Sequence, residues 1–448
     1  MISTGSPAKN QVRPARVASL RVLLVAENIS LRQSGETSIP YYYFDRLLRR
    51  KIEVHAICHA RVRDELRREL SAECFERITF IEDSSLQRAV FALGKLFHYR
   101  IEDLVFGQII QLLTQLRMRG LAKQLVQAHG ITLVFQPVPI SPRSPSFMFG
   151  LGAPVVIGPM CGGLELPAAF AAMDGRMVAW SIGRSRALAN LMHRLVPGKC
   201  QAAALIVGNR RTAAALPHGT RGRVYEVVES GVDLERWAPK PYPVVQAGAK
   251  VRFVFCGRLV DWKGASLLVE AFVPLAKSGR AVLDLIGDGE LRAELERQIA
   301  AAGIGEAVRV HGRLPLARCI ELMTAADVYA MPSLRECGGL ALLEAMAIGL
   351  PIVATNWMGP AEYLTPACAI LVDPVSKDAM VAGFTEAMSR LADSPPLRQA
   401  LGQAARTRVF GGHFGWESKV TRVVEIMSEV LEERAGRSSY AVLGVGQA

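Results

Sequence analysis

The start of the chain alternates between strand and helix patterns. The segment Arg21–Ala26 is a short apolar run typical of a buried parallel strand. A polar loop containing Gly35 follows, then a helical pattern over Ile39–Arg50 and a second strand pattern over Glu53–Cys58. This order of strand, glycine-bearing loop, helix and strand predicts the βαβ unit that opens a doubly wound, Rossmann-like domain.

The same alternation begins again in the middle of the chain. A strand pattern over Val251–Cys256 leads into a loop from Gly257 to Gly264, and a helical pattern over Ala265–Lys277 follows. Because 448 residues exceed what one compact core accommodates, two domains are expected. Closely spaced prolines in residues 240–243 predict the linker. We therefore predict an α/β chain with two parallel-sheet domains, over residues 19–240 and 241–410, after a disordered lead over residues 1–18.

Helical patterns occupy residues 61–129, including Leu86–Phe97 and Ile101–Val126. The second of these carries basic residues toward its end. A basic amphipathic helix can lie on an anionic membrane, and a core helix with a solvated basic end is the alternative. The uncharged run from Ser144 to Leu164 contains three prolines and five glycines. A membrane-spanning helix does not tolerate that density of helix breakers, so we expect no transmembrane segment there.

The net charge of +12 is unevenly distributed. Residues 1–240 carry 32 Lys and Arg against 19 Asp and Glu, whereas residues 241–448 carry 21 against 22. An anionic partner such as a membrane surface, a diphosphate-bearing acceptor or nucleic acid would meet the first half, and a purely solubilising surface is the alternative.

The eight cysteines are scattered singly, with neither a C-x-x-C motif nor a paired histidine cluster. We therefore expect no disulfide framework and no zinc site, and a reduced cytoplasmic setting. The first twenty residues lack an apolar core, so no signal peptide is expected.

Two loops carry charged residues that are candidates for a binding or catalytic site. In the first, Glu336 precedes the pair Gly338-Gly339, and Glu344 follows in an apolar helical run that starts at Leu340. The backbone N–H groups at such a helix N-terminus are free to bind phosphate oxygens. Two glutamates at this spacing can equally be a solvated helix face.

The second loop carries Arg258 and Lys263, between a strand pattern and a helix pattern. Both side chains are expected to point into the same cleft. Breaking the bond between a sugar and a nucleotide diphosphate places negative charge on the leaving oxygen, and two cations near a helix N-terminus can stabilise it. The chain contains no Asp-x-Asp motif, which is the usual metal-binding alternative, so we expect no metal and no cofactor.

The two loops together resemble the signatures of glycosyltransferase family 4, retaining enzymes of the GT-B fold. The resemblance covers the E-x7-E spacing with Glu-Ala-Met-Ala-x-Gly-x-Pro after it, and the Gly-Arg-Leu-x-x-x-Lys-Gly motif of residues 257–264. It implies that Arg258, Lys263 and the N–H groups around Gly339 and Leu340 hold the donor diphosphate. It also implies that Glu336 contacts the donor sugar, that Glu344 binds the ribose hydroxyls, and that a helix over residues 411–435 crosses back to the first domain.

The resemblance implies further donor contacts and some departures. The implied contacts include Gly257, Gly338, Arg313 and Leu314 in the second half, and Gly35 in the first. Where many family members carry a histidine after the strand ending near Gly158, this chain has Met160 and Cys161. Where the family usually has a larger residue after the first glutamate, it has Gly338, so we expect more room beside the sugar.

These features predict a metal-independent hexosyltransferase. The donor would be a UDP- or GDP-linked sugar and the acceptor a glycan or lipid-linked molecule, with a role in cell-surface polysaccharide synthesis. The protein would be cytoplasmic, with peripheral contact to an anionic membrane at its inner face. Within enzymes, a GT-B sugar-phosphate synthase or glucan synthase is the alternative. A catalytically inactive GT-B protein at an anionic surface is the alternative from another class, and no nucleic-acid partner is expected because no aromatic and basic interleaving appears.

Overall fold

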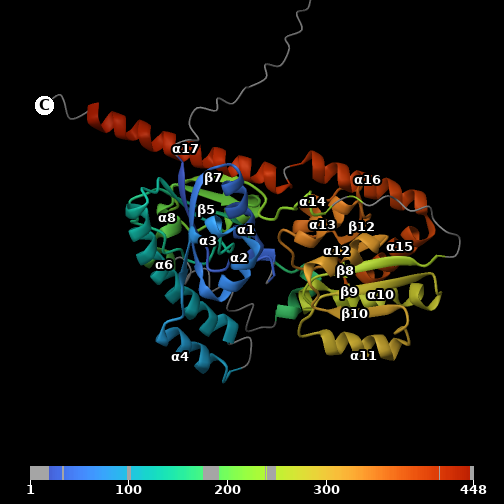
Figure 1. Ribbon diagram of the computed structural model, residues 1–448. Coiled ribbons are helices and arrows are strands. Elements are labelled where there is room, and N and C mark those ends of the chain that lie inside the picture. The colour runs from blue at the N-terminus through green and yellow to red at the C-terminus, as the bar shows by residue number, and fades with distance from the viewer. Residues whose placement is uncertain are drawn as a thin grey trace, which may run out of the picture.

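Two parallel β-sheets, each flanked by helices, lie side by side in the molecule (Figure 1). The computed structural model describes residues 20–32, 35–97, 102–174, 191–237, 239, 249–412 and 414–443. The expected lead over residues 1–18 and the expected linker at residues 240–243 lie outside the described residues. Each sheet is parallel throughout. The prediction of an α/β chain with two doubly wound parallel sheets is confirmed.

The first sheet has seven strands in the order β3-β2-β1-β4-β5-β6-β7. Its inner strands β1, β4, β5 and β6 are largely buried apolar runs, which is typical of parallel sheets covered on both faces, whereas the edge strand β7 is mostly exposed. The strands are β1 (Arg21–Val25), β2 (Glu53–His59), β3 (Ile78–Ile81), β4 (Leu133–Gln136), β5 (Val155–Met160), β6 (Ala204–Val207) and β7 (Arg223–Glu226).

The second sheet has six strands in the order β10-β9-β8-β11-β12-β13. These strands are β8 (Val251–Cys256), β9 (Ala281–Ile286), β10 (Val308–Gly312), β11 (Val328–Met331), β12 (Ile352–Thr355) and β13 (Ala369–Val372).

Helices connect the strands within each domain. The first domain contains α1 (Gly35–Arg49), the 3-10 helix η2 (Ala60–Val62), α2 (Arg63–Glu69), α3 (Ala72–Glu76), α4 (Ser85–Gly94), the π-helix η3 (Glu102–Gly107), α6 (Gln108–Ala128), α8 (Gly198–Gln201) and α9 (Arg210–Ala214). The 3-10 helix η4 (Ala168–Asp174) follows β5 along the chain, but its Phe170 packs in the core of the second domain. The second contains the 3-10 helix η5 (Asp261–Lys263), α10 (Ala265–Lys277), α11 (Arg292–Ala302), α12 (Leu316–Ala325), α13 (Leu340–Ile348), α14 (Met358–Tyr363), α15 (Lys377–Asp393) and α16 (Pro395–Gly411). None of the described helices combines the length and the apolar character needed to cross a membrane.

The structure corrects two predictions for residues 61–129. Helical patterns were expected within this segment and no strand was predicted there, but Ile78–Ile81 form β3 at the edge of the first sheet. The predicted helix over Ile101–Val126 begins instead with the π-helix η3 and becomes α-helical at Gln108. Four residues are too short a run for periodicity to separate a strand from a helical turn, which explains the missed strand.

The order of strands reverses at one place in each sheet. The reversal lies between β1 and β4 in the first sheet and between β8 and β11 in the second. Loops leaving the carboxyl ends of two such strands run to opposite sides and leave a crevice, and open α/β sheets bind ligands there. The loop of Lys263 follows β8 and the loop of Glu336 follows β11, so both predicted loops lie at the reversal.

A long final helix, α17 (Trp416–Leu443), packs on the first domain. Figure 1 shows it crossing over the first sheet. Trp416 stacks on Tyr42 of α1 at 4.7 Å between ring centroids. The buried Arg46 of α1 pairs with Asp233 at 3.3 Å and with Glu417 of α17 at 2.7 Å. The core of the first domain therefore contains side chains from both ends of the chain.

Candidate active site between the two sheets

The loops that follow β8 and β11 are fixed against one another. Gly264 has a φ of +72°, and a Cβ added there would lie 2.3 Å from the carbonyl oxygen of Pro332. The backbone N–H of Leu334 donates to the carbonyl of Trp262 at 2.8 Å. A side chain at position 264 would separate the loops, so glycine is required there for steric and conformational reasons.

This contact brings Lys263 to Glu336. The Lys263 ammonium forms an ion pair with the Glu336 carboxylate, and the two side chains are 22% and 11% exposed. Arg258 leaves the same loop as Lys263, but its side chain is 64% exposed and is 3.4 Å from Glu290. One predicted cation thus lies against a predicted acid, while the other stands at the rim, able to reach an anionic ligand.

The N-terminus of α13 borders the same crevice. Gly339 has a φ of +52° at the start of the helix, and no side chain caps this end. The N–H groups of the first turn are therefore available to an anion. A Cβ added at Gly35, on α1 of the first domain, would lie 3.2 Å from Leu340. The structure brings Gly35 and the start of α13 together across the two domains.

The remaining predicted donor contacts of the second half lie at the carboxyl ends of β8 and β10, with β9 between these strands. Gly257 follows β8 and donates its N–H to the carbonyl of Ile286 at 3.0 Å. Arg313 and Leu314 follow β10, where Arg313 is exposed and Leu314 is half-buried. The thiol of Cys319 donates to the carbonyl of Leu314 at 3.8 Å. These positions form one edge of the second sheet, beside Glu344.

Glu344 lies one turn into α13 and is half-buried. Burial raises the pKa of Glu344 to about 8; the neighbouring Cys319 raises it further and Arg236 lowers it. The effect of burial outweighs that of Arg236, so the Glu344 carboxyl group is mostly protonated at neutral pH. A ligand whose hydroxyl groups hydrogen-bond to the ionised form would replace the missing solvation.

We expect Glu344→Gln to change how stability depends on pH. The pKa of Glu344 is about 8 in the folded protein against a reference value of 4.5. The folded state therefore holds an extra proton between these values, and the free energy of unfolding falls as pH rises through that window. In thermal melts, Glu344→Gln should gain in Tm relative to the unsubstituted protein between pH 5 and pH 8. A Tm difference that stays constant with pH would contradict this assignment.

The space beside Gly338 is occupied, which corrects the expectation of extra room for the sugar. A Cβ added at Gly338 would lie 2.0 Å from Ser230 Oγ and 2.1 Å from Glu229 Oε1. Glu229 and Ser230 belong to the turn between the two domains. The absence of a side chain at 338 therefore permits a close approach of the domains.

A disulfide bond joins Cys161 and Cys337, contrary to the expectation of no disulfide framework. Cys161 follows β5 in the first domain and Cys337 adjoins Glu336 in the second. The 176 residues between them hid this pairing from spacing rules. Among the described residues, Cys161, Glu229 and Cys337 also form one group with metal-binding atoms within 4.8 Å of one another. The two sulfurs are bonded to each other in this state.

A polar cavity at the strand reversal of the first sheet was not predicted. It has a volume of about 200 Å³ and is lined by residues that include Glu27, Glu36, Gln111, Gln115 and Gln136. Burial raises the pKa of both Glu27 and Glu36. Glu27 and Gln136 stand at the carboxyl ends of β1 and β4, which is the sequence signal that could have found them.

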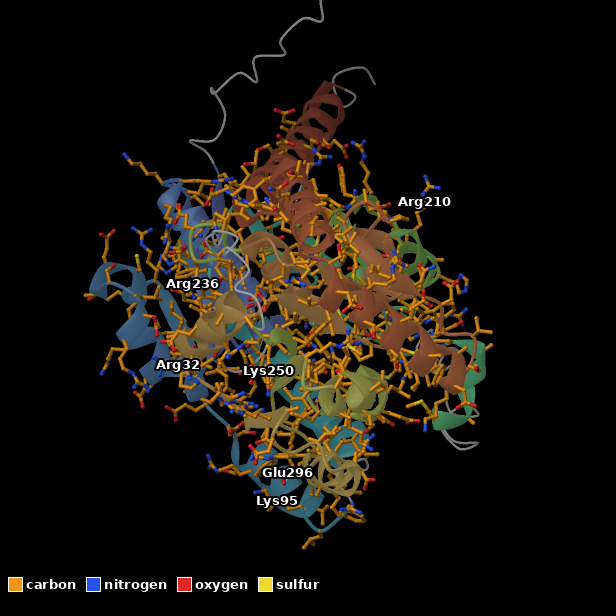
Figure 2. All side chains as sticks on the ribbon, turned by 90° about the vertical axis from the view of Figure 1, so that its right-hand side faces the viewer. Arg32, Lys95, Arg210, Arg236, Lys250 and Glu296 are labelled. Carbon is orange, nitrogen blue, oxygen red and sulfur yellow. A yellow bond between two sulfur atoms is a disulfide. The ribbon has the colours of Figure 1, made fainter. Side chains whose placement is uncertain are left out.

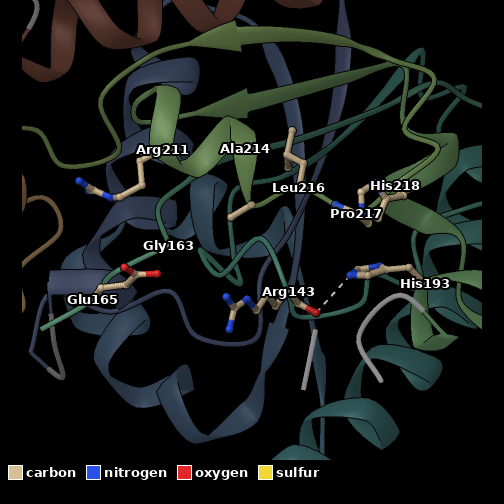
Figure 3. Close-up of a pocket in the computed structure, with 10 residues that line it drawn as sticks. Arg143, Gly163, Glu165, His193, Arg211, Ala214, Leu216, Pro217 and His218 are labelled. Carbon is tan, nitrogen blue, oxygen red and sulfur yellow. Dashed lines mark hydrogen bonds between the residues drawn. The ribbon is translucent and has the colours of Figure 1, made fainter. Parts of the chain in front are cut away.

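A further pocket of about 370 Å³ is lined in part by Gly163 and carries basic side chains. Figure 3 shows Arg211 and Glu165 at one end, Arg143 in the middle, and His193 and His218 at the other. Arg211 also pairs with Glu362 of the second domain at 2.7 Å. The pocket therefore adjoins the crevice between the two sheets.

Comparison with known proteins found relatives of the second domain. Residues 245–408 match the family described as glycosyl transferases group 1. The chain is 31% identical over 219 residues to a Corynebacterium glutamicum GDP-mannose-dependent monoacylated alpha-(1-6)-phosphatidylinositol monomannoside mannosyltransferase, covering 45% of this chain and 56% of that protein. It is 32% identical over 212 residues to an Arthrobacter D-inositol 3-phosphate glycosyltransferase, covering 45% and 49%. The match thus spans about half the length of these relatives.

Solved structures extend the likeness to both sheets. Sucrose-phosphate synthase from Thermosynechococcus elongatus superimposes with a TM-score of 0.62 at 17% identity, covering 92% of this chain and 100% of that one. The chain has the GT-B fold. The Anabaena protein Alr3699/HepE, solved with UDP and glucose, shares this GT-B fold with a TM-score of 0.59 at 15% identity, with coverage of 92% and 100%. In the GT-B arrangement found here, the ion pair of Lys263 and Glu336 lies in the second sheet's crevice, facing the first domain.

Proposed function

We propose that this protein is a retaining glycosyltransferase that moves a hexosyl unit from a UDP- or GDP-linked sugar to a hydroxyl group of a glycan or lipid-linked acceptor. One observation carries the proposal. Lys263, Glu336 and the uncapped N-terminus of α13 converge at the strand reversal of the second sheet. This arrangement offers cationic and N–H groups to a diphosphate beside an acid for the sugar.

The chain's own groups supply the electrostatics of the reaction. Arg258, Lys263 and the first-turn N–H groups of α13 stabilise the charge that develops on the leaving diphosphate as the anomeric C–O bond breaks. Glu336 hydrogen-bonds the donor sugar and stabilises positive charge near its anomeric carbon. The acceptor oxygen bonds to that carbon from the same face, and its proton passes to the leaving phosphate oxygen. In this proposal no protein nucleophile and no metal take part.

The acceptor is proposed to bind on the first domain. The cavity at the β1 and β4 ends presents carboxyl and amide groups that hydrogen-bond hydroxyl groups, as carbohydrates and polyols require. The basic pocket of Figure 3 adjoins the crevice and suits a negatively charged part of the acceptor. The relatives named for phosphatidylinositol mannosides and inositol 3-phosphate support acceptors that combine hydroxyl groups with phosphate.

A lipid-linked acceptor would place the protein at the cytoplasmic face of an anionic membrane, and one surface fits that position. We define the apolar tip as the exposed side chains of α4, η3, α6 and the turn after α4. They are Leu86, Phe91, Leu93, Leu96, Phe97, Val105, Ile109 and Leu116. Lys95 lies over the Phe91 ring at 4.7 Å, and Figure 2 shows Lys95 at one end of the molecule. Apolar side chains with adjoining cations match the interface of an anionic bilayer.

Replacing Leu93 and Leu96 with serine should reduce binding to vesicles. The two side chains are 50% and 79% exposed, so the folded core should be unaffected. Flotation with vesicles containing about one-third phosphatidylserine measures the bound fraction, and we expect it to fall several-fold. Val375→Ser, at a 72% exposed position in the second domain, is the matched control. Equal flotation of all three proteins would argue against the apolar tip.

A nucleotide panel tests the proposed function directly. Thermal melts with UDP, GDP and ADP should show stabilisation by one base in preference to the others, because a ligand at a hundred times its Kd adds about 2.7 kcal/mol. Product analysis with the matching nucleotide sugars then identifies the sugar and the configuration of the new bond. A sugar phosphate as the best acceptor would favour the synthase alternative. The absence of any stabilisation by the three nucleotides would refute the transferase assignment.

A further inference from the structure

One covalent bond crosses the crevice between the two domains among the residues that the structure describes. Cys161 is 4% exposed and follows β5, and Cys337 is half-buried and adjoins Glu336. Non-covalent contacts between the domains lie nearby. Asn209 donates to Glu362 at 2.9 Å, and the indole N–H of Trp357 donates to the carbonyl of Glu165 at 2.9 Å. These hydrogen bonds can break when the domains separate, but the disulfide cannot.

A buried glutamate beside the disulfide has a carboxylate oxygen that lacks a hydrogen-bond partner among the described residues. Glu229 is 1% exposed, and within the described part of the chain its Oε1 atom has no hydrogen-bond partner. A buried polar atom without a partner is unfavourable and needs an explanation. Its carboxylate lies within 4.8 Å of the sulfurs of Cys161 and Cys337. If the disulfide is reduced, each sulfur carries a proton and can donate to this carboxylate.

We propose that Cys161 and Cys337 form a reversible thiol–disulfide switch on the crevice. The disulfide holds the loop of Glu336 against the first domain, and the dithiol form allows the two domains to separate. Substrate entry and product release in such enzymes require opening of the crevice, so the dithiol form is the one that turns over. The expected difference in transfer rate between the two redox forms rests on the proposed function. The expected change in contact between the domains does not.

The switch requires a low-molecular-weight thiol as its reductant. A thiolate attacks the more accessible sulfur, that of Cys337, which breaks the disulfide and leaves Cys161 as a thiolate that takes up a proton. A second thiol molecule displaces the first from Cys337, which releases the oxidised small-molecule disulfide and the Cys337 thiol. Two electrons and two protons thus pass to the protein. Oxidation by a small-molecule disulfide reverses both steps.

A cavity lined by residues from both domains lies close to the two cysteines along the chain, although neither cysteine is among its lining residues. It has a volume of about 420 Å³ and is lined in part by Gly162, which adjoins Cys161, and by Arg335, which lies two residues before Cys337. Arg143 also lines it, so an anionic thiol would be attracted. In the cytoplasmic setting proposed above, disulfides are usually transient and regulatory, which agrees with a switch.

The experiment compares oxidised and reduced forms of the full chain. The protein is equilibrated in graded ratios of reduced and oxidised dithiothreitol and then trapped with an alkylating reagent. Peptide mass analysis should find the Cys161–Cys337 linkage in the oxidised form, and thiol titration after denaturation should give six free thiols against eight on reduction. If only the disulfide form or only the dithiol form is found at every dithiothreitol ratio, the proposed switch is wrong.

Two readouts then separate the switch from the proposed function. Hydrogen exchange in residues 336–342 should be faster in the reduced protein, and transfer should be about 10-fold faster, a difference of about 1.4 kcal/mol in barrier. Cys337→Ser should behave as the reduced form in both redox states, whereas Cys74→Ser, on α3, should respond as the unsubstituted protein does. Redox-dependent exchange without any transfer would refute the transferase alone. Equal exchange and equal transfer in both forms would refute the switch.

Discussion

Lys263→Ala is expected to lower kcat by about 10³-fold, the effect of removing one group that stabilises a developing negative charge. The Lys263 ammonium is held beside Glu336 by contacts between the loops after β8 and β11. Arg258, the other predicted cation, stands at the exposed rim beside Glu290 and does not occupy the position of Lys263. Steady-state transfer with the donor found in the nucleotide panel measures the effect.

A matched control variant tests whether the fall in kcat comes from the missing ammonium group or from unfolding. Lys277→Ala removes the same side chain from the exposed end of α10 and should leave kcat unchanged. Lys263→Ala should still unfold in one cooperative transition, at a lower Tm because the largely buried Glu336 loses its partner. Near-normal transfer by Lys263→Ala would remove the group on which the proposed mechanism depends.

Gly338→Ala is expected to lower kcat by about 10²-fold, the effect of displacing reacting groups by about 1 Å. The added Cβ would meet Ser230 Oγ at 2.0 Å and Glu229 Oε1 at 2.1 Å, so the two domains must separate at this point. Glu336, two residues earlier, would move with the loop. The same transfer assay measures the loss.

Two further variants test the cause of that loss. Gly305→Ala is the control, because a Cβ there meets nothing within 4 Å and should leave transfer intact. Adding Ser230→Gly to Gly338→Ala removes one of the colliding groups and should restore part of the activity. Normal transfer by Gly338→Ala would contradict the requirement for close approach of the two domains at this point.

Local patterns predicted the fold well where each element carried its own signal. The strand Val251–Cys256 and the helix Ala265–Lys277 form as expected, because an apolar β-branched run and a 3.6-residue period are properties of single segments. The strand Ile78–Ile81 was missed because four residues between helices show no decisive period. The helix after Phe97 was expected to start regularly, and the π-helical turn at Glu102–Gly107 has no signal in composition.

The candidate site was also predictable only in part. The loops of Lys263 and Glu336 could be paired from the sequence because a family resemblance supplied the spatial relation that spacing alone lacks. The bond between Cys161 and Cys337 could not, since no rule links two single cysteines on different domains. The occupied space beside Gly338 depends on how the interdomain turn approaches the loop, which is a tertiary property of Glu229 and Ser230.

The position of α17 bears on how the polypeptide folds as it is synthesised. Trp416, Val420, Val423, Ile426 and Met427 are almost fully buried among apolar side chains from β1, α1 and β2. The N-terminal half therefore leaves the ribosome with an apolar surface that stays open until residues 416–427 have emerged. Domains generally fold as units in the order of their synthesis. Here we expect the second domain to acquire its native packing on the ribosome first, and the N-terminal half to depend on chaperones until translation reaches α17.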